Sequence, residues 1–199
     1  MSRFGPGLFR LRSFARACGG VAAIEFAFIA PILIFFYLGM AETCQLIMTQ
    51  RRVSHAASAL GDLVTQDTDI GSQEMLEIFE AGCTIMDPFV VGNSKFRVRI
   101  TSAKRGPDTD PTIRVAWSEN NGRGFADLAN NDPITVVTPL EAAGAAVVVT
   151  EVQYDYKSSV GFLMDTRLVK HRSEMRPRRS QEVLGPPAAT GTTTMYCSN

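Results

Sequence analysis

The feature that most constrains this chain is an apolar run of 21 residues from Val21 to Ala41, in which Glu25 carries the only charge. As a helix, this run extends roughly 30 Å, which is about the hydrocarbon thickness of a membrane. Pro31 and Gly39 would weaken a helix in water but are tolerated in a helix that spans a membrane. The run therefore predicts a membrane-spanning helix rather than the core helix of a soluble domain.

The charges on either side of the run predict its orientation. Residues 1–20 contain four arginines and no acid, which leaves 16 basic and 20 acidic residues for the rest of the chain. A basic segment before an apolar run is typical of a cytoplasmic N-terminus. The remainder is too weakly charged for a nucleic-acid-binding protein, and it has no basic stripe interleaved with aromatic residues.

A cleavable secretory signal is the main alternative to a permanent anchor. The residues Gly39, Met40 and Ala41 place small side chains where signal peptidase would need them. A cut after Ala41 would release the rest of the chain, which could then be an exported enzyme. The long basic segment and the apolar residues that continue past Ala41 both favour the anchor.

Beyond the apolar run, the helical periodicity continues with a different pattern. Apolar residues now recur with a spacing near 3.5, which places them on one face of a helix: Leu46, Val53, Ala56, Ala57, Leu60, Leu63 and Val64. We therefore predict one helix over residues 21–65, membrane-spanning in its first half and amphipathic in its second. The apolar face of the second half needs a partner surface, which the rest of the chain would supply.

Residues 66–185 are predicted to form an α+β domain. A short helix is expected over residues 72–83, with Ser72 as its N-cap and Asp87-Pro88 beyond its end. Alternating apolar and polar residues predict strands near 95–102, 112–118 and 145–156, and a loop from Asn120 to about Pro133. The expected arrangement is a small antiparallel sheet packed on the amphipathic helix, followed by a flexible tail over residues 186–199.

The sequence offers little that resembles a catalytic or metal site. His55 and His171 have no acidic or cysteine neighbours at metal-ligand spacing, and there is no CxxC motif. Asp108 and Asp110 supply too few oxygen ligands for calcium, so a solvated loop is the simpler interpretation. We therefore expect no bound metal, no cofactor and no enzymatic activity.

Six basic residues gather between Arg167 and Arg179, in the sequence RLVKHRSEMRPRR. They could meet anionic lipid headgroups or an acidic partner. Alternatively, they form a solvated face that is paired with acids of the long helix. The pattern is compatible with either a helix or a strand in this segment.

The four cysteines fall into two groups. Cys18 precedes the apolar run and Cys44 follows it closely, whereas Cys83 and Cys197 both lie in the part expected to be exported. An oxidising compartment would allow a disulfide between Cys83 and Cys197, which would also hold the tail. Sequence spacing leaves open whether the two residues meet.

The start of the apolar run resembles a type IV prepilin processing site: arginines, then Gly20, then an apolar helix with Glu25 at the fifth position after that glycine. Its continuation, GGVAAIEFAFIAPILIFFYLGMAE, resembles the TadE-like pseudopilins of the tight-adherence (Flp) pilus system. The shared features are Ala23, Glu25-Phe26-Ala27, Pro31, Gly39 and Glu42, with similar segments in RRVSHAASALGDLVTQ and VQYDY. The resemblance covers about residues 16–66. The downstream domain is larger than in a short TadE-type protein, so a TadG-like member is the alternative within the family.

This resemblance implies a minor pilin with a pilin-like fold in the bacterial inner membrane, with residues 1–20 as a cytoplasmic leader and residues 66–185 in the periplasm. A prepilin peptidase would cut after Gly20 and leave a free amine on Val21. Glu25 would neutralise such an amine on a neighbouring subunit and so fix the axial register of assembly. Glu42, near the opposite membrane face, would reach water.

The partners implied by the resemblance are the membrane, the peptidase, other pilin or pseudopilin subunits and the pilus assembly machinery. Two alternatives stay open. One is a signal-anchored envelope scaffold that is never processed, and the other is the exported enzyme released after Ala41.

Overall fold

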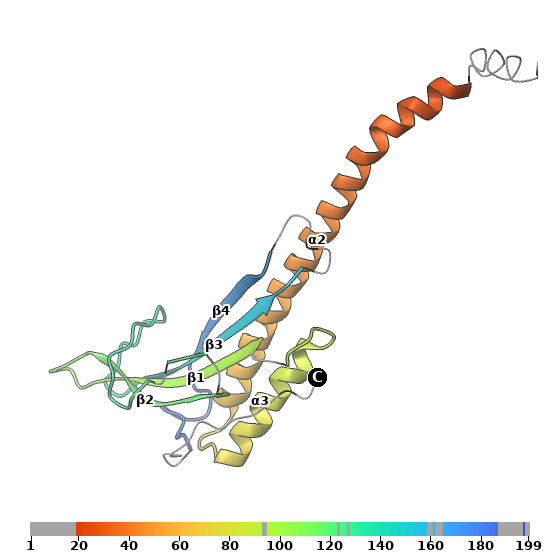
Figure 1. The fold of residues 1–199 in the computed structure, drawn as a ribbon. Coiled ribbons are helices and arrows are strands. Elements are labelled where there is room, and N and C mark those ends of the chain that lie inside the picture. The colour runs from red at the N-terminus through yellow and green to blue at the C-terminus, as the bar shows by residue number, and fades with distance from the viewer. Residues whose placement is uncertain are drawn as a thin grey trace, which may run out of the picture.

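The computed structural model describes residues 19–92, 95–122, 124–126, 128–158, 161, 165–186 and 197. The arginine-rich leader up to Cys18 and most of the expected tail lie outside these residues. Helix α2, Gly19–Gln66, is a single helix of 48 residues with Pro31 inside it. Its first half projects away from the rest of the molecule, and its second half packs against the sheet (Figure 1). The prediction of one continuous helix is confirmed.

Four antiparallel strands form a single sheet in the order β2-β1-β3-β4. Their bounds are β1, Phe96–Arg105; β2, Ile113–Asn120; β3, Ala146–Tyr156; and β4, Arg167–Met175. The three predicted strands are present, and residues 167–175 of the basic run form the edge strand β4. The α+β class with a long helix on a small antiparallel sheet is confirmed.

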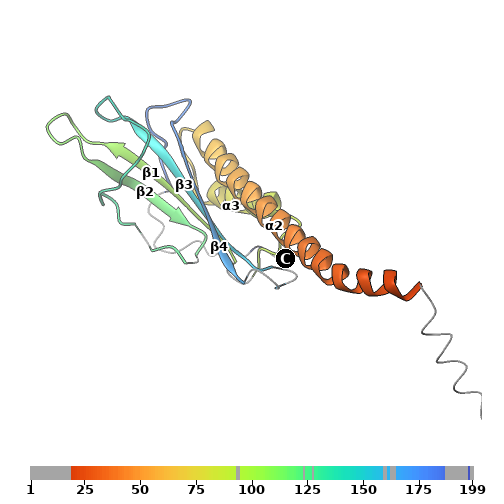
Figure 2. The same ribbon diagram turned by 90° about the horizontal axis from the view of Figure 1, so that it is seen from above.

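The second half of α2 and helix α3, Ser72–Met86, cover one face of the sheet (Figures 1 and 2). The largest core cluster lies between these layers and includes the following buried residues: Val53, Ala56, Leu60, Val64, Phe79, Phe96, Val98 and Val152. Leu63 was predicted to share this apolar face, but 38% of it is exposed. At 100° per residue, Leu63 lies roughly 80° from the centre of the buried stripe, at its margin.

Two glycines allow the helices to approach their neighbours closely. A Cβ atom at Gly82 of α3 would lie 3.1 Å from Leu60 of α2 and 3.2 Å from the ring of Phe96. A Cβ atom at Gly61 of α2 would lie 3.0 Å from the hydroxyl of Thr150 on β3. Larger side chains at these two positions would therefore push α2 away from α3 and from the sheet.

The ends of α3 differ from the sequence expectation. The N-cap residue is Gly71, which provides no side-chain cap, so the prediction of Ser72 as the N-cap is wrong. The backbone turn closes instead through the amide of Met75, which donates to the Gly71 carbonyl at 3.0 Å. At the other end, the Arg52 guanidinium of α2 donates to the carbonyl oxygens of Ile85 and Asp87. A side chain from another helix thus satisfies carbonyls that the helix end leaves unpaired.

The second face of the sheet is covered by the long connection between β2 and β3. The loop predicted to end near Pro133 continues to Ala145, and its apolar side chains Ile134, Val136 and Leu140 join Ala103, Val147 and Val149 in a smaller cluster. Beyond β4 the chain returns to the opposite edge of the sheet, at β2. There the Trp117 indole donates to the Val183 carbonyl at 2.8 Å.

Candidate membrane-anchor and assembly site

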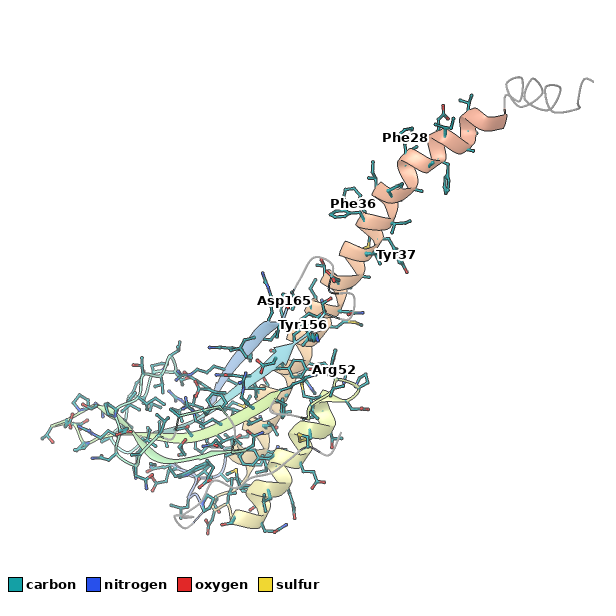
Figure 3. The ribbon with its side chains drawn as sticks, in the orientation of Figure 1. Phe28, Phe36, Tyr37, Arg52, Tyr156 and Asp165 are labelled. Atoms are coloured by element: carbon teal, nitrogen blue, oxygen red, sulfur yellow. A yellow bond between two sulfur atoms is a disulfide. The ribbon has the colours of Figure 1, made fainter. Side chains whose placement is uncertain are left out.

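The first half of α2 exposes apolar side chains around its whole circumference. Figure 3 shows Phe28, Phe36 and Tyr37 pointing away from the helix axis in different directions, and Phe28 is 75% exposed. Within the described residues, α2 is the one helix that is long and apolar enough to cross a membrane. An apolar surface of this extent is stable only inside a bilayer or among other apolar helices.

Gly20 and Val21, the predicted processing site, lie in the first turn of α2 and are exposed. A Cβ atom at Gly20 would meet nothing within 4 Å. No contact within the described chain therefore explains the glycine at this position.

Glu25 lies one turn beyond Val21 and its side chain is exposed. It forms no ion pair or hydrogen bond with any residue that the structure describes. A carboxylate at the margin of an apolar helix is costly unless water, a headgroup or an opposite charge stabilises it. A partner for Glu25 must therefore come from outside the described fold.

Glu42 is the site residue whose surroundings the sequence did not reveal. It was expected to reach water, but it is fully buried, with 0% exposure. The Ser158 hydroxyl donates to Glu42 Oε1 at 2.7 Å, and the Gly161 amide donates to the same hydroxyl oxygen at 3.1 Å. The segment that follows β3 thus folds over α2 where the helix leaves its apolar half. This contact joins residues 116 positions apart, which no local pattern can show.

We expect Ser158→Ala to lower the free energy of unfolding by about 1.5–3 kcal/mol, because it removes a hydrogen bond to a buried carboxylate. Denaturant unfolding of the full chain in detergent micelles measures this change. Ser72→Ala is the matched control, since Ser72 is exposed and makes no side-chain cap. Equal stability of the two variants would contradict a stabilising role for the Glu42–Ser158 contact.

The tail is linked to the domain by a disulfide. Cys83 of α3 and Cys197 are bonded, with their Cα atoms 5.7 Å apart. Cys44 on α2 is a free, exposed cysteine. The bond closes a long loop that includes the whole sheet, and both half-cystines pack against the main core.

The remaining candidates for chemistry do not come together. Among the described residues, no group of three or more His, Cys, Asp or Glu could hold a metal ion. Asp110 accepts hydrogen bonds from the Thr112 hydroxyl and amide and pairs with Arg114, and these contacts lower its pKa below the usual range. Asp108 pairs with Arg105 at 2.9 Å. Both carboxylates of this loop are thus occupied by protein donors.

One comparison with known proteins gives a match. The family model described as TadE-like protein matches residues 20–61. The chain carries a TadE-like segment. The match covers about a fifth of the chain and supports an association with Tad (Flp) pilus systems. No curated protein and no solved structure gives a significant match to the chain.

The TadE-like segment coincides with the features described above. It begins at Gly20, contains Glu25 and Glu42, and ends at Gly61 in the packed half of α2. Together with the exposed apolar helix, it fits a single-pass membrane anchor in a pilus system. Helix α3 and the four strands lie outside the matched residues.

Proposed function

We propose that this TadE-like protein is a minor pilin or pseudopilin that takes part in the assembly of a Tad (Flp) pilus. The observation that carries the proposal is Glu25, an exposed carboxylate with no partner in the described chain, on a helix whose apolar side chains are exposed all around. Such a helix is suited to be surrounded by lipid before assembly and by other helices afterwards. Neighbouring pilin subunits would then supply the positively charged partner that Glu25 lacks within the described chain.

The proposed mechanism starts with cleavage after Gly20 by a prepilin peptidase. The cut would create an α-amine on Val21, which is as costly in an apolar bundle as the Glu25 carboxylate. Pairing the amine of one subunit with Glu25 of the next neutralises both groups and selects one axial register. Gly20 then serves the peptidase, which agrees with its lack of contacts within the fold.

The proposed topology places residues 1–20 in the cytoplasm as a leader, residues 21–41 in the inner membrane and residues 66–185 in the periplasm. The Cys83–Cys197 bond supports this placement, because structural disulfides persist in an oxidising compartment. The bond would hold the end of the tail, residues 186–199, against α3.

The test of processing is the intact mass of the protein extracted from membranes of its native host. We expect the mass of residues 21–199, and we expect Gly20→Val to retain residues 1–20, because a β-branched side chain replaces the small residue before the cut. Ala41→Leu is the matched control, since it removes the signal-peptidase site and should leave cleavage after Gly20 unchanged.

An intact N-terminus in the unaltered protein would contradict processing and favour the unprocessed scaffold. Loss of residues 1–41 would contradict the assembly mechanism as well, because both Val21 and Glu25 would be removed.

A further inference from the structure

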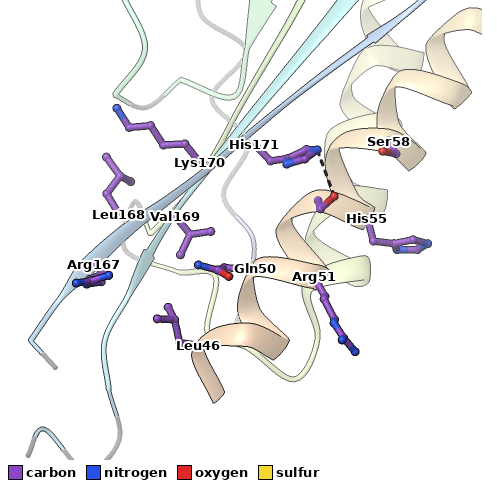
Figure 4. A pocket seen from close by; sticks show the side chains of 11 residues that line it. Leu46, Gln50, Arg51, His55, Ser58, Arg167, Leu168, Val169, Lys170 and His171 are labelled. Carbon is purple, nitrogen blue, oxygen red and sulfur yellow. Dashed lines mark hydrogen bonds between the residues drawn. The ribbon is translucent and has the colours of Figure 1, made fainter. Parts of the chain in front are cut away.

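A basic groove lies between the packed half of α2 and the edge strand β4 (Figure 4). It has a volume of about 720 Å³, and its lining contains three arginines or lysines, two histidines and no acid: Arg51, His55, Arg167, Lys170 and His171. Leu46, Leu168 and Val169 add apolar side chains to the same groove, and Gln50, Ser54 and Ser58 complete its lining.

The charges of this groove have no acidic partner among the described residues. In the part of the chain that the structure describes, Arg51, Arg167 and Lys170 form no ion pair. Of the basic run, Arg178 pairs with Asp62 of α2 and Arg172 pairs with Glu174. The interpretation of the run as a face paired with acids of the long helix therefore applies to Arg178 and not to the groove.

The edge of β4 is open beside the groove and covered beyond it. Leu168 is 45% exposed. Farther along the strand, Arg172 donates to the Thr135 carbonyl, and Glu174 accepts from the amides of Val137 and Thr138. The β2–β3 connection thus covers the distal end of β4, and among the described residues it does not reach the end nearer the membrane.

Helix α3 presents the opposite charge on the other side of α2. Glu74, Glu77 and Glu80 follow one another at a spacing of three residues, which places them along one side of the helix. The helix contains no basic residue, and Glu77 and Glu80 are exposed. None of the three glutamates forms an ion pair with a described residue.

The two charged surfaces cannot meet within one molecule. In Figure 1, β4 and α3 lie on opposite sides of α2. We propose that the basic groove of one copy of this chain binds the acidic side of α3 of a second copy. The charges are complementary, and the contact uses a different surface on each partner, so the second copy still has a free groove. A contact of this kind repeats into a ring or a filament.

The heights of the two surfaces along α2 favour a filament. The groove spans Leu46 to Ser58, whereas Gly82 of α3 lies against Leu60. Helix α3 starts near Gln66 and runs back along α2, so its glutamates, which precede Gly82, lie closer to Gln66 than Leu60 does. Bringing the surfaces together therefore requires successive copies to be shifted along the helix axis by roughly 20 Å. This inference deepens the proposed function by naming a second copy as a partner, and it rests on that function for the membrane placement of α2.

Charge reversal of each surface tests the contact in the full-length protein in detergent micelles at low salt, with sedimentation velocity as the readout. We expect the unaltered protein to form oligomers that dissociate as salt is raised. Arg51→Glu with Lys170→Glu, and separately Glu77→Lys with Glu80→Lys, should each weaken self-association on the order of tenfold or more. An equimolar mixture of the two double variants should recover it, because each reversed surface then finds its complement.

The matched control is Arg179→Glu with Glu141→Lys, which reverses two exposed charges outside both surfaces and should leave self-association unchanged. A monomeric unaltered protein at low salt, or a mixture that fails to recover oligomers, would overturn the proposal. In the alternative outcome, the Arg51→Glu, Lys170→Glu variant loses binding to phosphatidylglycerol vesicles while its oligomers stay intact. That result would overturn the proposed contact and show that the groove binds a lipid headgroup. Cleavage after Gly20 is measured independently, by intact mass. Failure of this contact can therefore be distinguished from failure of the proposed function.

Discussion

Replacing Glu25 with alanine is expected to abolish pilus assembly while leaving membrane insertion and folding of the outer domain intact. Glu25 forms no hydrogen bond or ion pair with any described residue, so its removal breaks no polar contact of the described fold. Loss of the charge should even favour insertion, because acidic residues oppose it on insertion scales. Assembly would lose the only charge in the apolar run that can pair with a Val21 amine on a neighbour.

Counting surface pili in the native host measures this effect, with membrane fractionation to show that the variant still inserts. Glu25→Gln keeps the size of the side chain and should be as defective as alanine if the negative charge is what matters. Glu141→Ala, an exposed acid of the outer domain, should assemble normally. Unchanged piliation in the two Glu25 variants would argue against the role of Glu25 in subunit register.

Removal of the Cys83–Cys197 bond is expected to produce the largest loss of stability. The bonded residues are 114 positions apart, and a cross-link across so long a loop restricts the unfolded chain strongly. Loss of such a native disulfide typically costs about 2–5 kcal/mol. We therefore expect Cys197→Ser to lower the free energy of unfolding by that amount, without disturbing α3 itself.

Denaturant unfolding of the full chain in micelles, with and without a reducing agent, measures this change. The reductant should destabilise the unaltered protein and have no effect on Cys197→Ser. Cys44→Ser is the matched control, since Cys44 is exposed and unbonded, and it should behave like the unaltered protein. Equal stabilities under oxidising and reducing conditions would show that the bond adds nothing to the fold.

Local patterns in the sequence were sufficient for the main elements. A run of 21 residues with one charge and a following apolar stripe predicted helix α2, and alternation predicted β1, β2 and β3. These signals are readable because helices and strands repeat every 3.6 and 2 residues. The same pattern identified Glu25 as unusual, because it is the only charge in the apolar run. Gly20 was identified by the resemblance to a prepilin processing site.

Such local patterns did not predict the contacts between residues that are far apart in the sequence. Arg52 reaches the end of α3, and the strand β4 was compatible with either a helix or a strand until its pairing with β3 was known. The N-cap prediction at Ser72 failed because the helix begins one residue earlier than its composition indicated. For Arg52 and β4, a neighbour in space rather than in sequence decided the outcome.

By itself, the sequence determined that this chain has an apolar helix with one glutamate near its start, continued by an amphipathic helix and three strands. The tertiary structure alone decided that Glu42 is buried under Ser158 and that the basic run forms an open sheet edge beside α2. The reason is physical: helix and strand periods are local properties of the backbone. The burial of a carboxylate and the exposure of a groove depend on which distant segments fill the space around them.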